Sequence, residues 1–136
     1  MARQETTETL LNAVNKLAPL IREHADEAEQ NRRLSEPVVD ALAEAGFFRL
    51  YTPRTLGGLE VDPLTFTRVV EALACIDGST AWCVWLASTN PLFVPNLMDT
   101  AVEEIFGRNP NVVTAGVILP YGKAEVRAGG YTVSGR

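Results

Sequence analysis

The clearest pattern in the chain lies between residues 62 and 90, where apolar positions recur at the spacing of a helix. Asp62 offers a carboxylate to the first turn, and Pro63 suits the first helical position because the amide it lacks has no partner there. The residues on the apolar stripe are Phe66, Val69, Val70 and Leu73. This spacing predicts a helix that begins at Pro63 and buries one face.

A second apolar segment follows a break in the pattern at Asp77 and Gly78. Residues 81–87 (AWCVWLA) are apolar on every side, and Ser79 or Thr80 can cap a helix before them. Periodicity alone does not separate a buried helix from a buried strand here, but the capping residues and the Ala, Leu and Trp content favour a helix. We predict a central helix with no solvent face. The side chains expected to be nearly fully buried are Val70, Leu73, Trp82 and Leu86.

Two further helices are predicted before this central pair. The first carries an apolar stripe interrupted by Pro19, which predicts a kink or a break. The charged stretch REHADEAEQNRR then describes a solvated helix face and holds the only histidine, His24. The second helix begins after Ser35 as its cap and ends at Gly46. The segment FFRLY that follows is expected to be extended, and TPRTLGG to be a loop whose glycines permit turns.

Beyond Gly107 the pattern changes from helix to strand. Residues 112–119 (VVTAGVIL) are rich in β-forming side chains. Residues 123–127 and 131–134 then alternate with a period of two around an Ala-Gly-Gly sequence, which predicts a hairpin.

This change divides the chain into a helical N-terminal domain over residues 1–110 and the beginning of a β domain over residues 111–136. A hairpin and one more strand leave a sheet edge and an apolar face uncovered. We therefore expect the chain to be the front part of a longer protein or a truncated gene product.

Composition and charge narrow the classes of partner. The 136-residue chain has a formal net charge of −5 and offers no basic face for nucleic acid or an anionic membrane. Its two cysteines lie in apolar segments, which is typical of a reducing compartment. The N-terminus has no apolar signal core, and no apolar run reaches the ~18 residues of a membrane helix. We expect a cytoplasmic protein.

The common sequence motifs for nucleotide and metal chemistry are absent. The chain has no G-x-G-x-x-G, phosphate loop, C-x-x-C or H-E-x-x-H, so no metal site is predicted. A serine nucleophile would need a histidine base, and His24 lies among surface charges without a partner that the sequence identifies. Trp82 and Trp85 offer flat rings to a ligand, but aromatic residues in an apolar helix usually belong to a core. The catalytic residues stay unknown.

The order of three segments carries a family resemblance. They are LSEPVVDALAEAGFFRLYTPRTLGGLEVDP, then DGSTAW, then a β-rich part with ILPYGKAEVRAGGYTVSGR. This order resembles the N-terminal half of the acyl-CoA dehydrogenase superfamily. GFFRLYTPRTLGG followed by DGSTAWCVWLAS is most similar to its flavin-dependent monooxygenase branch, near the oxygenase components of hydroxyphenylacetate hydroxylases. The resemblance implies a mostly α chain, with a helical domain followed by the first strands of a β-barrel domain.

Carried over residue by residue, the resemblance implies a substrate pocket on the central helix. Trp82 falls on the family's frequent Trp after the DGST turn. The stretch from Ser88 to Asn90 falls where the helical domain lines the substrate pocket. Many members of the monooxygenase branch have a histidine where Asn90 stands. Asn90 can hydrogen-bond a flavin or a substrate, but it supplies no acid or base near neutral pH.

The resemblance also implies a flavin site, with FAD or FMN between the barrel and a C-terminal four-helix domain. Leu119, Pro120 and Gly122 fall on the family's strand-end segment close to the flavin. The family's flavin-contacting Trp segment and its closing C-terminal helices would come after Arg136. We therefore expect these 136 residues alone to be inactive and to hold flavin weakly or not at all.

The resulting hypothesis is a flavin-dependent oxidoreductase, monooxygenase-like, represented by its N-terminal portion. The implied partners are a small aromatic substrate, a flavin reductase and further copies of the chain in a tetramer or dimer. One alternative is a true acyl-CoA dehydrogenase that oxidises acyl-CoA thioesters. Another is a non-catalytic helical module that docks on a partner through its exposed strand edge.

Overall fold

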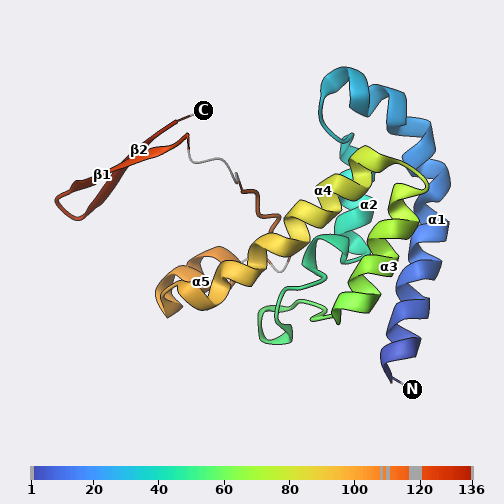
Figure 1. Ribbon diagram of the computed structural model, residues 1–136, viewed down its shortest axis with the longest axis horizontal. Helices are drawn as coiled ribbons and strands as arrows, with labels where there is room; N and C mark the ends of the chain where they lie inside the picture. The colour runs from blue at the N-terminus through green and yellow to red at the C-terminus, as the bar shows by residue number, and fades with distance from the viewer. Residues whose placement is uncertain (1, 108, 110, 117–120, 136) are drawn as a thin grey trace.

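The computed structural model describes residues 2–107, 109, 111–116 and 121–135. Helices gather in one body, with α1 and α3 side by side and α4 running obliquely next to α3, while the β1–β2 hairpin stands away from this body (Figure 1). The prediction of a mostly α chain that ends in strands is confirmed. The elements are α1 (Ala2–Asn31), α2 (Glu36–Glu44), η1 (Phe47–Arg49), η2 (Arg54–Leu56), α3 (Pro63–Ala74), α4 (Gly78–Thr89), η3 (Asn90–Asn96), α5 (Asp99–Phe106), β1 (Lys123–Arg127) and β2 (Gly130–Ser134), where η marks a 3-10 helix.

An aspartate fixes the start of each central helix. Asp62 caps α3 as predicted, since its Oδ1 accepts hydrogen bonds from the backbone amides of Leu64 at 3.1 Å and Thr65 at 3.3 Å. At α4 the cap is Asp77, whose Oδ2 accepts from the amide of Thr80 at 2.6 Å. The prediction of Ser79 or Thr80 as this cap is wrong, because both lie inside the first turn and the extended residue before the helix is Asp77.

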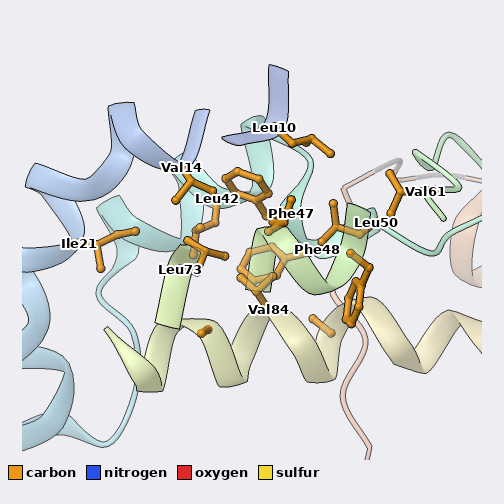
Figure 2. Packing of buried hydrophobic residues seen from close by; sticks show 14 of the residues in the cluster. Leu10, Val14, Ile21, Leu42, Phe47, Phe48, Leu50, Val61, Leu73 and Val84 are labelled. Carbon is orange, nitrogen blue, oxygen red and sulfur yellow. The ribbon is translucent and has the colours of Figure 1, made fainter. Parts of the chain in front are cut away.

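The core lies where α1, α2, α3 and α4 meet η1 (Figure 2). Leu73 from α3 is fully buried, which confirms its predicted place. The short 3-10 helix η1 contributes two adjacent phenylalanines to the core, and both side chains are buried. The other fully buried large side chains are Phe47, Ile21, Leu42, Leu50, Val14, Val69 and Val84.

Helix α4 has a solvent face, contrary to the prediction. Its buried positions include Ala81, Val84, Ala87 and Ser88, which share one side of the helix. Trp82 lies off that side and is 58% exposed, so its predicted burial is wrong. Val70 and Leu86 were also predicted to be nearly fully buried, but they are only half-buried. An apolar sequence all round does not bury a helix when packing partners cover only one side.

The segment FFRLY is not extended as expected but forms η1 and turns at once. Gly46 ends α2 in the left-handed region, at φ +79°, and its amide bonds to the carbonyl of Ala43 at 3.0 Å. The carbonyl of Gly46 then accepts from the amide of Arg49 at 3.0 Å. This tight geometry turns both Phe47 and Phe48 into the core, whereas an extended chain would send alternate side chains to opposite faces.

Three smaller predictions have different outcomes. Helix α1 continues through Pro19 without a break, and Figure 1 shows its two halves bending relative to one another. Ser35 is the cap residue of α2 as predicted, but its hydroxyl makes no capping hydrogen bond. The loop glycines serve turns: Gly57 has φ +78°, and a Cβ on Gly58 would lie 1.9 Å from the carbonyl oxygen of Thr52.

The C-terminal hairpin is confirmed, and both of its strands are exposed. Ala124 pairs with Val133 and Val126 with Tyr131, so these four side chains share one apolar face without cover from a described residue. Residues 112–116 do not form the predicted strand, and the remainder of that run, 117–119, lies outside the described residues. Within the described part of the chain, no helix is both long and apolar enough to cross a membrane.

Replacing Leu73 with alanine should lower the free energy of unfolding by about 2 to 5 kcal/mol, because the side chain is fully buried and leaves a cavity. Leu64 lies in the same helix but is 60% exposed, so Leu64→Ala is a matched control with an expected change below about 0.5 kcal/mol. Urea denaturation followed by circular dichroism measures both variants. Equal losses would contradict the central position of Leu73.

Candidate functional site

The candidate site residues on α4 lie in two separate places. Trp82 is near the start of the helix, and Ser88 and Asn90 are at its end. At a rise of about 1.5 Å per residue, the eight residues from Trp82 to Asn90 span about 12 Å. The structure therefore does not bring the three side chains together in one small cavity.

Trp82 forms an exposed aromatic platform with Trp85. Their ring centroids are 5.2 Å apart and the rings are nearly parallel, at 18°. On one side, Trp82 borders a hollow that also includes Arg32 and Arg33, which follow the end of α1. On the other side, both indoles border an apolar groove against α3 that includes Val70. This surface offers a flat, partly apolar face to a ring-shaped ligand or to another protein surface.

Ser88 is fully buried in the core, where its side chain makes a hydrogen bond. Its Oγ donates a hydrogen bond to the backbone carbonyl oxygen of Phe47 at 2.7 Å. This bond ties α4 to η1, two elements that are far apart in the sequence. The buried Ser88 hydroxyl thus has a hydrogen-bond partner, as buried polar groups in a core usually do.

Asn90 connects the end of α4 to the segment that precedes the strands. Its Nδ2 donates a hydrogen bond to the carbonyl oxygen of Thr114 at 2.9 Å. The hydroxyl of Thr114 donates back to the carbonyl oxygen of Ala87, at 3.5 Å. Gly116 lies against the same carboxamide, since a Cβ built there would be 2.8 Å from Asn90 Oδ1. These partners were not visible in the sequence, because no periodicity links residues so far apart.

The predicted flavin contacts are only partly described. Leu119 and Pro120 lie outside the described residues, and Gly122 is exposed just before β1. Gly122 has the backbone of Ser134 and Gly135 as its near neighbours, so the described residues around it form the open end of a hairpin. The described residues do not by themselves fit around a flavin, because they provide no enclosed wall on this side.

A buried hydrogen-bond network near the start of α3 had no signal in the sequence. Thr65 Oγ1 donates to Asp62 Oδ2 at 2.8 Å and lies 2.7 Å from Thr7 Oγ1, so the Thr7 hydroxyl is the donor of that second bond. Both threonines are buried, and this hydrogen-bond network connects α1 to the capped end of α3. A hydroxyl pair separated by 58 positions leaves no sequence signal.

Within the part of the chain that the structure describes, two titratable groups have a shifted pKa. Burial, and then the charge of Asp77, raises the pKa of the Cys83 thiol, which keeps it protonated and a poor nucleophile at neutral pH. Burial, and then the charge of Asp62, raises the pKa of Tyr51. Among the described residues, no group of histidine, cysteine and acidic side chains is placed to hold a metal ion.

Removing the Ser88 hydroxyl should destabilise the fold, which distinguishes a core role from a ligand-binding one. Ser88→Ala leaves the buried carbonyl of Phe47 without its donor and should cost about 1 to 3 kcal/mol of unfolding free energy. Ser79 is exposed on the same helix, so Ser79→Ala serves as the control and should change little. Thermal and urea unfolding measure both. If Ser88→Ala is as stable as the control, the bond to Phe47 does not support the core.

Comparison with known proteins identifies relatives over nearly the whole chain. The oxygenase subunit HsaA of a flavin-dependent monooxygenase from Mycobacterium tuberculosis is 34% identical over 133 residues, which make up 98% of this chain and 34% of that protein. Indole-3-acetate monooxygenase from Pseudomonas putida is 34% identical, over 95% of this chain and 32% of that protein. The chain spans about a third of the length of these relatives.

A solved structure shows the same fold. XiaF from Streptomyces, in complex with FADH2 and glycerol, matches with a TM-score of 0.93 and 30% identity, over 98% of this chain and 34% of that one. The family model for the acyl-CoA dehydrogenase N-terminal domain matches residues 4–105. This range begins in α1 and ends in α5, so it contains all the helices of the core. The chain belongs to the acyl-CoA dehydrogenase family, as its N-terminal domain.

Proposed function

We propose that this chain forms the N-terminal helical part of the oxygenase component of a flavin-dependent monooxygenase. The supporting observation is that relatives similar over at least 95% of the chain are named monooxygenases, and HsaA is named the oxygenase subunit of a flavin-dependent one. The fold match to XiaF, which binds FADH2, supports reduced flavin as the cofactor. When bound, reduced flavin supplies the electrons that activate oxygen for the reaction with the substrate.

In this proposal α4 forms one wall of the substrate pocket. Trp82 is the aromatic residue of that wall with the more exposed ring, and its stacked partner Trp85 holds the indole in place. Ser88 and Asn90 support the same wall through their hydrogen bonds to neighbouring backbone. The substrate class that suits a flat indole platform is a small aromatic compound.

The flavin site requires residues beyond those described. Leu119, Pro120 and Gly122 remain the proposed contacts, and the rest of the cofactor's surroundings comes from other parts of the assembled enzyme. The apolar hairpin face of Ala124, Val126, Tyr131 and Val133 supports the domain division at residues 110 and 111, because it needs further strands to cover it. A flavin reductase, a homo-oligomer and a cytoplasmic location complete the proposal.

A chimera tests the proposed activity. This chain would replace the matching third of indole-3-acetate monooxygenase from Pseudomonas putida. With FADH2 and oxygen supplied, the folded chimera should consume indole-3-acetate in an oxygen-dependent reaction, and Trp82→Ala should weaken substrate binding. Product is measured by chromatography and bound flavin by absorbance. A chimera that binds flavin but oxidises acyl-CoA with an electron acceptor, without hydroxylation, would support a true dehydrogenase instead.

The 136-residue chain alone should self-associate and bind flavin weakly or not at all. Self-association is expected because the hairpin is uncovered, and its outer edges and apolar face favour pairing with another chain. Weak flavin binding is expected because the described residues near Gly122 provide no enclosed wall for the cofactor. Light scattering measures the size, and quenching of flavin fluorescence measures the affinity. A monomeric chain that binds FAD at micromolar affinity would contradict the proposal that the flavin site needs further domains.

A further inference from the structure

Asn90 directs both ends of its carboxamide at one short segment. Its nitrogen donates to the carbonyl oxygen of Thr114, and its oxygen is the atom nearest to the open side of Gly116. The side chain is half-buried between the two. The contact joins the end of α4 to residues that follow η3 and α5, so it closes a loop of 24 positions.

The second bond of this contact satisfies the end of a helix. The last four carbonyls of an α-helix have no partner within it, and Ala87 lies among them in α4. The hydroxyl of Thr114 donates to the carbonyl oxygen of Ala87. Thr114 therefore accepts from Asn90 through its backbone carbonyl and donates to α4 through its side chain, which fixes its position in two directions.

Gly116 is needed for space rather than for backbone conformation. Its φ does not lie in the left-handed region, unlike that of Gly46, Gly57 and Gly129. A Cβ at this position would lie 2.8 Å from Asn90 Oδ1, closer than real Cβ atoms approach. A larger residue at position 116 requires a shift of the Asn90 carboxamide, the same group that donates to Thr114.

Apolar packing does little to hold this segment. Residues 112–116 include no buried side chain, and Val113 is 48% exposed. Between the two ends of the loop, Pro91 and Phe106 are the buried residues among those described. The polar contacts of Asn90 and Thr114 are therefore what places the segment on the helical body.

We propose that Asn90, Thr114 and Gly116 form a clasp that fixes where the chain leaves the helical body. Asn90 is then a positioning residue, which acts through the backbone of Thr114 and sets the path toward the hairpin. This role differs from direct contact with a flavin or a substrate. It does not depend on the proposed oxygenase activity, so either can fail without the other.

Backbone order measured by ¹⁵N relaxation tests the clasp. In the wild-type chain, residues 112–116 should have order parameters near those of α4, about 0.85. Asn90→Ala and Asn90→Asp should both bring them below about 0.6, because each removes the donor to Thr114. Asn96→Ala is the matched control, since Asn96 also donates to a backbone carbonyl but within its own turn, to Phe93. It should leave residues 112–116 ordered.

A double substitution makes the test specific. Gly116→Ala should loosen the segment in the wild-type background by displacing the carboxamide. In the Asn90→Ala background it should have no further effect, because the clash and the bond are both already gone. Backbone order parameters in α3 that do not change from the wild-type values show that each variant is folded. The clasp is refuted if the segment is disordered in the wild type, if both Asn90 variants leave it ordered, or if the two substitutions act additively.

Discussion

The packing of α3 against α4 is the constraint on which the rest of the structure depends. Leu73 and Val84 are both fully buried, and the Phe47 side chain from η1 lies in the same cluster (Figure 2). Burial of side chains of this size contributes about 1.5 to 3 kcal/mol each. Asp62 and Asp77 cap the two helices and thus fix where each begins, which sets the register of the contact.

Helix α4 also organises the elements around it through polar bonds at its far end. Ser88 holds η1 from inside the core, and Asn90 holds the segment that leads to the strands. Trp82 lies off the buried side of α4, beside the groove against α3, and stays 58% exposed. One helix therefore contributes to the core, holds one earlier and one later segment, and carries the exposed Trp82.

Local signals in the sequence predicted the central helices and the hairpin, because caps and periodicity act between near neighbours. Asp62 with Pro63, and the alternating strands around Gly129, are such signals. The orientation of Trp82 was not predictable from an all-apolar segment, since the choice of buried side depends on what packs against it. The partner of Asn90 was equally hidden, because a hydrogen bond across 24 positions leaves no local pattern.

Amide hydrogen exchange on the 136-residue chain tests most directly whether the α3–α4 pair is the stable centre. Amides in the buried parts of α3 and α4 should exchange only by global unfolding and be the best protected. Those of β1 and β2 should exchange faster, through local opening, because the exposed hairpin contributes no side chain to the α3–α4 core. Hairpin amides as well protected as those around Leu73 would contradict the account.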